Sequence, residues 1–317
     1  MRIGVLTSGG DAPGMNAAIR AVVRAGIAAG DTVIGIHDGY RGLVEGKFEE
    51  FSRKSVSEIL NSGGTILGTA RLPEFKEEVI RKLAIKQMHR YDIDALIVIG
   101  GDGTYQGGAR LTEMGVKVIG IPGTIDNDIA SSDYTIGFST ALNTACEAID
   151  KLRDTSSSHQ RCSIIEVMGR HCGDLAVYSG LVCGAEFIIT EGTGLNKDEL
   201  LDQLKRNRLA GRRHAIVVMS ENITDVYSLA KEVEEYSGYE CRATILGYVQ
   251  RGGQPTPEDR LLASRLGAYS IDLLHKDISG VCVGIHHNGN VYTPFAEALS
   301  MKSQDNKHIF KLAKQIL

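Results

Sequence analysis

Ile99-Gly100-Gly101-Asp102-Gly103-Thr104 is one of two stretches that decide the fold, and Pro122-Gly123-Thr124-Ile125-Asp126-Asn127-Asp128 is the other. Each follows an apolar strand-like run, and a helix-like segment over residues 104–115 lies between them. Strand, helix and strand in this order predict two turns side by side at the carboxyl edge of a parallel sheet. Amides at a helix start attract phosphate, while carboxylates hold magnesium or accept a proton from an alcohol. The pair of turns therefore indicates phosphoryl transfer from a nucleotide to a hydroxyl group.

Strand-like runs alternate with helical patterns along nearly the whole chain, which predicts an α/β fold with a mostly parallel sheet. The first strand, residues 3–7, enters a glycine-rich turn at residues 8–14, and a helix follows. Glycines predict a turn over residues 39–42, and a charged helix is expected over 74–90. Further along, the pattern predicts a strand over 243–249 and a cluster of turns over 250–255.

The composition is that of an ordinary globular protein: 317 residues, 43% hydrophobic and 23% charged, with a net charge of −4. The negative charge argues against nucleic-acid binding, and no apolar run reaches transmembrane length. The N-terminus reads as a strand and lacks the pattern of a signal peptide. Six scattered cysteines indicate reduced thiols in a cytoplasmic protein and favour neither a metal site nor a disulfide framework.

Taken singly, these motifs also fit plain structural explanations. The Gly-Gly-Asp-Gly turn fits a tight strand-to-helix connection capped by Asp102, and Asp126 and Asp128 fit an Asx turn. A dinucleotide fingerprint is absent because Gln106 stands at the place of its third glycine, and no Walker A sequence occurs. A lone arginine near a strand end is usually a surface residue, although arginines beside glycines suit phosphate.

Five motifs in order resemble the bacterial ATP-dependent 6-phosphofructokinase family along the whole chain. They are Thr7-Ser8-Gly9-Gly10-Asp11, Gly100-Gly101-Asp102-Gly103, residues 122–128, Met168-Gly169-Arg170 and Gln250-Arg251-Gly252-Gly253. The resemblance implies phosphorylation of fructose 6-phosphate at its 1-hydroxyl, with ATP and Mg²⁺. It also implies two Rossmann-like three-layer α/β/α domains: residues 1–138 plus 252–304 for ATP, and residues 139–251 plus 305–317 for fructose 6-phosphate.

The resemblance assigns roles to individual residues. Asp126 would be the base, and Arg170 and Thr124 would stabilise the transferring group. Further contacts to that group or its surroundings would come from Gly10, Arg71 and Asp128. Magnesium would be held by Asp102 and Asp128. The ATP site would comprise Gly10, Tyr40, Arg71, Leu72, Lys76, Gly101, Asp102, Gly103, Thr104 and Gln106. The sugar-phosphate site would comprise Thr124, Asp126, Asp128, Arg161, Met168, Gly169, Arg170, Glu221, Arg242, Tyr248 and Arg251.

Assembly and regulation are also implied by the resemblance. Arg161 and Arg242 would reach the 6-phosphate from a neighbouring subunit of a homotetramer. An effector pocket for ADP or phosphoenolpyruvate would lie between subunits, at Arg20, Arg24, Arg53, Arg153, Glu186, Arg212, Arg213 and His214.

The identity of the phosphoryl donor is indicated by two glycines. Pyrophosphate-using relatives generally carry aspartate at the position of Gly103 and lysine at that of Gly123. An aspartate at 103 would crowd and repel the α-phosphate of a nucleotide, so glycine favours ATP.

Two departures from the family pattern bear on binding. Tyr248 replaces a usual histidine at the 6-phosphate, which predicts weaker binding of fructose 6-phosphate because tyrosine brings no positive charge. Ala210 replaces a usual arginine of the effector pocket, which predicts weak or absent effector binding. The open alternatives are a pyrophosphate-dependent or altered-acceptor sugar-phosphate kinase of the same fold, and a non-catalytic nucleotide sensor.

Overall fold

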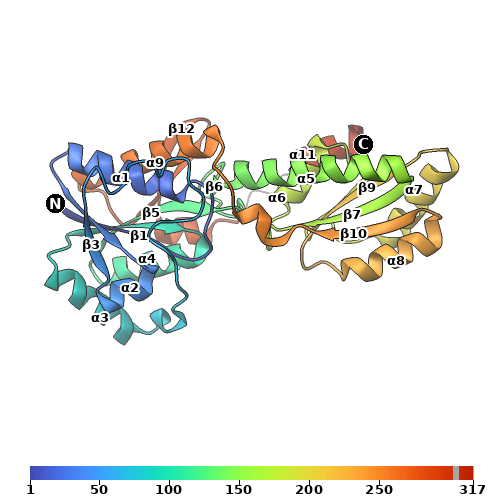
Figure 1. Ribbon diagram of the computed structural model, residues 1–317. Helices are drawn as coiled ribbons and strands as arrows, with labels where there is room; N and C mark the ends of the chain where they lie inside the picture. The colour runs from blue at the N-terminus through green and yellow to red at the C-terminus, as the bar shows by residue number, and fades with distance from the viewer. Residues whose placement is uncertain (303–306, 317) are drawn as a thin grey trace. The chain divides into compact units, whose positions relative to one another are not determined.

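The computed structural model describes residues 1–302 and 307–316, and the chain divides into two units. The first comprises Met1–Thr140 and Arg251–Ser303, and the second comprises Ala141–Gln250 and Gln304–Leu317. The predicted return of the chain to the second domain, at residues 304–305, lies outside the described residues. Each unit contains a sheet with helices on both of its faces, which confirms the predicted α/β class (Figure 1).

The sheet of the first unit has eight strands, seven of them in the order β12-β11-β5-β4-β1-β2-β3, with β6 paired to β5. Its strands are β1 (Arg2–Thr7), β2 (Thr32–Ile36), β3 (Phe48–Phe51), β4 (Ala95–Gly100), β5 (Lys117–Thr124), β6 (Ile136–Gly137), β11 (Val281–His286) and β12 (Gly289–Pro294). The central strands run parallel, and the edge strands β3 and β12 run antiparallel to their neighbours. Every residue of β4 is buried, as expected for a central strand covered on both faces.

Helices cover both faces of this sheet (Figure 1). One face carries α1 (Met15–Ala28) and α9 (Pro257–His275), and the other carries α2 (Gly39–Glu45), α3 (Glu78–Arg90) and α4 (Asp102–Glu113). The short α10 (Phe295–Ser300) follows β12. Gly267 lets α1 and α9 approach closely, because a Cβ there would lie 2.6 Å from the Cβ of Ala21.

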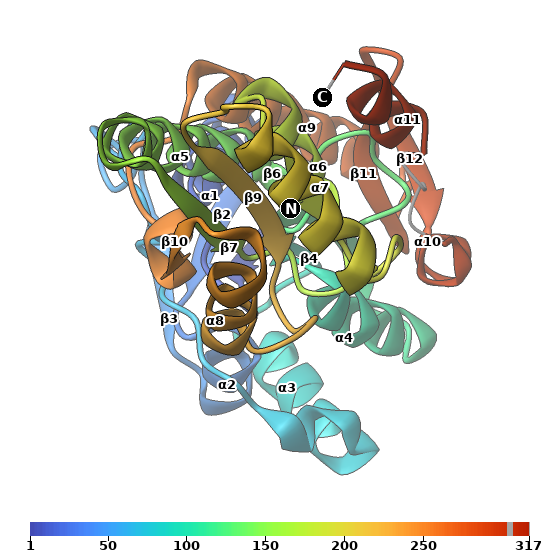
Figure 2. The same cartoon turned by 90° about the vertical axis from the view of Figure 1, so that its right-hand side faces the viewer.

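The second unit has a four-stranded parallel sheet in the order β10-β7-β9-β8. Its elements are α5 (Phe138–His159), which begins in the first unit, β7 (Arg161–Val167), α6 (Asp174–Val182), β8 (Phe187–Ile189), α7 (Lys197–Leu209), β9 (Ala215–Ser220), α8 (Val226–Ser237), β10 (Glu240–Ile245) and α11 (Lys307–Ile316). Leucines and valines of α7 and α8 share one core with Ile164 and Val217 of the sheet. On the other face α6 packs against Ile188 and Val218. Figure 2 shows these layers from the end of the unit.

Buried Asp259 joins α9 to the start of α5. Its carboxylate accepts hydrogen bonds from the backbone N–H of Gly137 at 2.9 Å and of Thr140 at 2.8 Å. The hydroxyl of Thr140 donates a third at 2.5 Å. Burial raises the pKa of Asp259, although the three donors oppose that rise. The carboxylate therefore satisfies amides at a helix start that would otherwise lie buried without a partner.

Three local predictions were wrong. The predicted turn at residues 39–42 is the first part of α2, and Gly42 serves close packing there, because a Cβ would lie 1.6 Å from the carbonyl oxygen of His37. The predicted helix over 74–90 is broken at Glu77, where the backbone is extended after the 3₁₀ turn η1 (Pro73–Lys76). The predicted strand over 243–249 ends at Ile245, and the 3₁₀ turn η2 (Gly247–Arg251) takes its last residues and the start of the predicted turn cluster.

The β11–β12 hairpin was not predicted, although the sequence carries a signal for it. His286 pairs with Gly289, so His287 and Asn288 form a two-residue turn, and both have positive φ (47° and 63°). Positive φ at both central residues is the type I′ geometry, and the Asn-Gly pair that favours such turns stands one residue later than the central pair, at Asn288 and Gly289. Among the described residues, no helix combines the length and the apolar character that crossing a membrane requires.

Candidate active site

The carboxyl ends of β1, β4 and β5 meet in the first unit. Gly100 pairs with Pro122, so the turn after β4 and the turn after β5 lie side by side. The hydroxyl of Thr104 donates to the carbonyl oxygen of Ser8 at 3.0 Å, which joins the glycine-rich turn after β1 to the start of α4. A Cβ at Gly101 would lie 3.6 Å from the Cβ of Thr124. The turns after β1, β4 and β5 therefore lie together at one edge of the sheet.

The first turn exposes the amino end of α4. Asp102 begins the helix, and its carboxylate accepts a hydrogen bond from the Gln106 side chain at 2.6 Å. A Cβ at Gly103 would meet no protein atom within 4 Å, so the surface at this glycine is open. Positive dipole charge and open backbone at a helix start suit a phosphate group.

Tyr40, which the resemblance assigns to the ATP site, packs against the start of α4. The ring is 5% exposed and stacks on Phe75 with ring centroids 4.2 Å apart. Its hydroxyl donates to the carbonyl oxygen of Thr104 at 2.6 Å, and burial raises the pKa of that hydroxyl. Tyr40 therefore supports the turn from below, whereas Arg71 and Lys76 are exposed and Leu72 packs against the core.

The second turn is braced by its own hydrogen bonds. The Thr124 hydroxyl accepts from the backbone N–H of Asp126 at 3.2 Å. Asn127 has a φ of 56°, and its side chain accepts from the N–H of Thr135 at 3.0 Å. The Asx-type role thus falls to Asn127, while the half-buried Asp126 and Asp128 are the carboxylates of the turn. Left-handed backbone at a non-glycine residue is common at functional sites.

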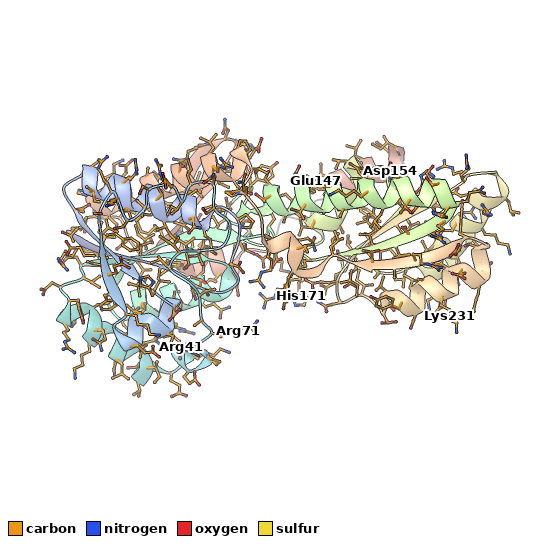
Figure 3. The ribbon with its side chains drawn as sticks, in the orientation of Figure 1. Arg41, Arg71, Glu147, Asp154, His171 and Lys231 are labelled. Atoms are coloured by element: carbon orange, nitrogen blue, oxygen red, sulfur yellow. The ribbon has the colours of Figure 1, made fainter. Side chains whose placement is uncertain are left out.

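Arg251 returns to the glycine-rich turn after β1. Its guanidinium forms an ion pair with Asp11 at 2.5 Å and lies 3.0 Å from the position that a Cβ at Gly10 would occupy. Glycine at position 10 thus makes room for the guanidinium. Asp11 was missed as a site residue, although it belongs to the Thr7–Asp11 motif. Elsewhere in the first unit, the Arg41 side chain donates to the carbonyl oxygen of Arg71 at 2.7 Å and holds the loop at Arg71 in place (Figure 3).

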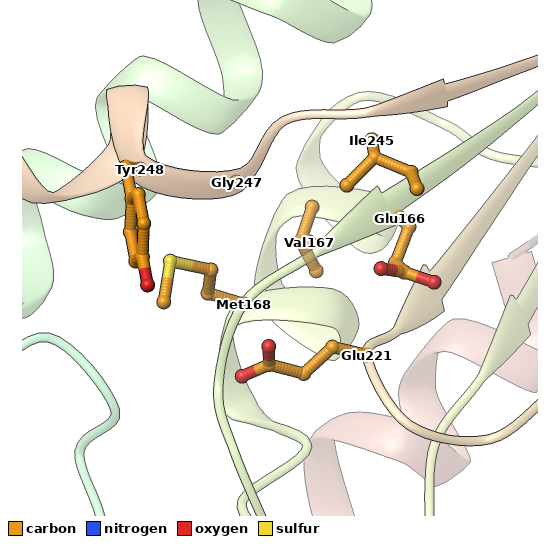
Figure 4. A pocket seen from close by; sticks show the side chains of 7 residues that line it. All are labelled: Glu166, Val167, Met168, Glu221, Ile245, Gly247 and Tyr248. Atoms are coloured by element: carbon orange, nitrogen blue, oxygen red, sulfur yellow. The ribbon is translucent and has the colours of Figure 1, made fainter.

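The second unit has a cavity of about 240 Å³ at the carboxyl ends of β7 and β9. Figure 4 shows Met168 and Tyr248 pointing toward one another at its mouth, with the Glu221 carboxylate below Met168. Glu221 accepts from the backbone N–H of Arg170 at 2.8 Å, and Arg170 has a φ of 55°. Burial, together with the charges of Glu221 and Asp225, raises the pKa of Glu166 in the wall of this cavity. The predicted residues Met168, Glu221 and Tyr248 therefore line one cavity, and the backbone of Arg170 is hydrogen-bonded to one of them.

Arg161 and Arg242 lie elsewhere. Arg161 is the first residue of β7, and Met168 directly follows its last residue. A strand rises about 3.3 Å per residue, so the two residues lie roughly 23 Å apart. Both arginines pair with the carboxylate of Glu240, which lies 2.9 Å from Arg161 Nε. The hydrogen bond from Arg161, followed by the charges of both arginines, lowers the pKa of Glu240. Glu240 was missed because only the pairing of β7 with β10 brings it beside Arg161.

Comparison with known proteins places the whole chain. The family model described as Phosphofructokinase matches residues 2–274.

The chain belongs to the phosphofructokinase family.

Relatives that match over nearly their full length carry the name ATP-dependent 6-phosphofructokinase. The protein from Photobacterium profundum is 55% identical, and the match covers 99% of both chains. A Vibrio cholerae protein of the same name is 54% identical with equal coverage.

Solved structures share the fold. Phosphofructokinase from Saccharomyces cerevisiae matches with a TM-score of 0.86 at 34% identity, over 99% of this chain and 46% of the yeast chain. This chain therefore spans about half the length of the yeast protein. A pyrophosphate-dependent phosphofructokinase from Marinobacter aquaeolei matches with a TM-score of 0.87 at 18% identity, over 97% of this chain and 86% of the other. At that identity the likeness shows the fold alone.

In this phosphofructokinase, five of the predicted effector residues belong to the second unit. Arg212 lies 3.6 Å from Glu186, and Arg153 lies 3.4 Å from the ring of His214. Arg213 is exposed beside them. Three further members belong to the first unit: Arg20 and Arg24 one turn apart on α1, and exposed Arg53. Burial, and then the charge of Arg24, lowers the pKa of Arg20.

Proposed function

We infer that this phosphofructokinase transfers the γ-phosphoryl group of ATP to the 1-hydroxyl of fructose 6-phosphate. The products are fructose 1,6-bisphosphate and ADP, and the reaction is a step of glycolysis. The observation that carries this conclusion is 54–55% identity, over nearly the full length, to proteins named ATP-dependent 6-phosphofructokinase. The adjoining turns after β4 and β5 supply a physical reason, because phosphoryl transfer depends mainly on positioning and charge neutralisation.

For the chemical step we propose Asp126 as general base. It accepts the proton of the 1-hydroxyl as that oxygen attacks the γ-phosphorus. Thr124 donates a hydrogen bond to the transferring group, and the guanidinium of Arg170 stabilises its negative charge. Gly10 and Arg71 contact the same group. The braces around the second turn hold Asp126 in place before substrate arrives, which lowers the entropic cost of the step.

For the nucleotide we propose the amino end of α4, within an ATP-binding domain of residues 1–138 plus 252–304. Asp102 and Asp128 are the proposed magnesium ligands. Among the described residues no group of three His, Cys, Asp or Glu side chains is placed to hold a metal. Two carboxylates fit Mg²⁺ in a kinase, since it keeps water ligands and takes others from substrate phosphates. When bound, the ion neutralises phosphate charge.

For the sugar phosphate we propose the cavity at Met168 and Glu221, within residues 139–251 plus 305–317, with Tyr248 and Arg251 at the 6-phosphate. Arg161 lies too far along β7 to reach this cavity in its own subunit. We therefore propose a homotetramer in which Arg161 and Arg242 serve a neighbouring subunit. A cytoplasmic location follows from the glycolytic role.

The inference is tested by replacing Asp126 with Asn and measuring ADP formation with fructose 6-phosphate. We expect turnover to fall by several orders of magnitude while ATP binding is kept, because the amide cannot take the proton. The matched control is Asp92→Asn, an exposed residue with left-handed backbone that Asn tolerates. Full turnover by Asp126→Asn would exclude Asp126 as the general base. A native enzyme without turnover would support the sensor alternative, and preference for pyrophosphate would support the other kinase.

An effector site for ADP or phosphoenolpyruvate is proposed at the arginines of the second unit together with Arg20, Arg24 and Arg53. Ala210 is the exposed C-cap of α7, and the arginine usual there is missing. One charge-assisted phosphate contact contributes about 1.5–3 kcal/mol, which corresponds to tenfold or more in affinity. Calorimetric titration should therefore show weak binding in the native enzyme and tighter binding in Ala210→Arg. Tight binding by the native enzyme would refute the weak site.

A further inference from the structure

Two thiols from distant parts of the chain meet in the second unit. Cys146 lies within α5, and Cys183 directly follows α6. The thiol of Cys183 donates a hydrogen bond to the carbonyl oxygen of Cys146 at 3.9 Å, so the side chain of Cys183 lies against the turn of α5 that carries Cys146. Both residues are partly exposed, whereas Cys162, Cys172, Cys241 and Cys282 are buried. Partial exposure therefore distinguishes this pair from the other four thiols.

We propose that Cys146 and Cys183 form a redox-modification site, at which hydrogen peroxide converts the two thiols into a disulfide that ties α5 to the end of α6. No part of the kinase mechanism uses these thiols, so the proposal stands apart from the proposed function. The cysteines lie 37 positions apart in sequence, so the bond would link two elements of the fold that the backbone joins only through β7 and α6.

The environment makes Cys146 the attacking group. The hydrogen bond from Cys183 lowers the pKa of Cys146, against the opposing effects of burial and of the carboxylates of Asp150 and Glu147. The same hydrogen bond, with burial, raises the pKa of Cys183. A thiolate is the nucleophilic form of cysteine, so oxidation begins at the residue whose thiolate is favoured.

The reaction balances in two steps. The Cys146 thiolate attacks one peroxide oxygen, an S–O bond forms as the O–O bond breaks, and hydroxide leaves to take up the proton that the thiol released. The sulfur of Cys183 then attacks the sulfenic sulfur, the S–S bond forms, the S–O bond breaks, and water leaves with the Cys183 proton. Two thiols and one hydrogen peroxide give one disulfide and two waters.

A second close pair in the unit provides an internal control. Cys162 and Cys241 face each other on β7 and β10. Both are buried, and its hydrogen bond to Cys241, together with burial, raises the pKa of Cys162. Proximity is therefore shared by both pairs, while partial exposure belongs to Cys146 and Cys183, and the lowered pKa belongs to Cys146. Peroxide should distinguish them.

The bond would also act on the backbone beside it. The Arg153 guanidinium donates to the carbonyl oxygen of Cys183 and, at 3.1 Å, to that of Gly184. The proposed disulfide would therefore form beside the backbone carbonyls that bind Arg153.

The test uses the full-length enzyme, reduced and then treated with hydrogen peroxide. Free thiols are blocked by alkylation, and the protein is digested with trypsin without reductant for mass spectrometry. We expect peptide 118–151, which holds Cys146, to be linked to peptide 171–197, which holds Cys183. Dithiothreitol should release the two peptides. Because Cys172 shares the second peptide, Cys172→Ser is tested in parallel and should keep the link.

Single replacements then separate the two steps. Cys146→Ser should abolish the link, and Cys183→Ser should stop at a sulfenic acid on Cys146 that dimedone traps. In the internal control, Cys162 and Cys241 should both remain free thiols after peroxide and react fully with the alkylating reagent once the protein is briefly denatured. If the native enzyme keeps both Cys146 and Cys183 alkylatable after peroxide, or links Cys162 to Cys241 as readily, the proposal is wrong. The peptide map of the native enzyme decides this even if a variant fails to fold.

Discussion

Replacement of Tyr248 by histidine should strengthen the binding of fructose 6-phosphate. Tyr248 stands at the mouth of the Met168 cavity, where a phenol donates one hydrogen bond and brings no positive charge. A histidine at this position can carry a proton and bind the 6-phosphate dianion through a charge-assisted hydrogen bond. The change is expected to lower KM for fructose 6-phosphate and to leave KM for ATP unchanged.

The size of the effect follows from the exposure of the residue. A hydrogen bond to a charged group contributes about 1.5–3 kcal/mol. Tyr248 is 77% exposed, however, so water screens the charge and about 1 kcal/mol is the fitting estimate. That free energy corresponds to a roughly fivefold lower KM. Since the unperturbed pKa of histidine is about 6.5, the gain should be larger at about pH 6 than at about pH 8.

Initial rates of ADP formation at saturating ATP, measured against fructose 6-phosphate concentration, give the required KM. Tyr248→Phe is the matched control, because it removes the hydroxyl and keeps the ring; its KM should equal or exceed that of the native enzyme. If Tyr248→His leaves KM unchanged or raises it, Tyr248 does not contact the 6-phosphate as proposed.

Two further predictions concern stability. Asp259→Ala should lower the free energy of unfolding by about 3–5 kcal/mol, because it leaves two buried N–H groups unsatisfied at roughly 1–3 kcal/mol each and removes a hydroxyl partner. Urea unfolding measures this loss, and an equal loss in exposed Glu258→Ala would contradict it. Burial alone would raise the pKa of Asp31, but hydrogen bonds from the terminal ammonium group and His275 outweigh it and lower that pKa. Its contribution to stability is thus complete above the unfolded pKa of about 4 and is lost as pH falls through the lower folded pKa. The stability difference between the native enzyme and Asp31→Asn should shrink between about pH 5 and pH 2, and a constant difference would refute this.

The central part of the fold could be predicted from sequence because its signals are local. The apolar run of β4, the glycine turn after it and the periodicity of α1 each specify one element, and the parallel sheet then brings the turns together. The predictions that were wrong concern features that depend on tertiary contacts. In the sequence Gly42 looks like a turn residue, yet glycine is needed there because a Cβ would clash with the carbonyl oxygen of His37.

The site shows the same division. Asp126 and Thr124 stand in a motif, so their proximity was predictable. Glu240 could not be found, because its importance comes from lying beside Arg161 across two strands that are far apart in sequence. The burial of Tyr40 was equally hidden, since stacking on Phe75 leaves no trace in either local sequence.

The length of β7 has a consequence for mixtures of inactive enzymes. Arg161 stands at one end of the strand, and Met168 lies just beyond the other end. In the proposed tetramer, Arg161 therefore contributes to the pocket of a neighbouring subunit, while Met168 contributes to the pocket of its own subunit. A variant damaged only at Arg161 and a variant damaged only at Met168 would then rebuild intact pockets when their chains are co-assembled. Hybrid tetramers assembled from the two inactive variants would regain activity, and dilution that dissociates the tetramer would inactivate even the native enzyme.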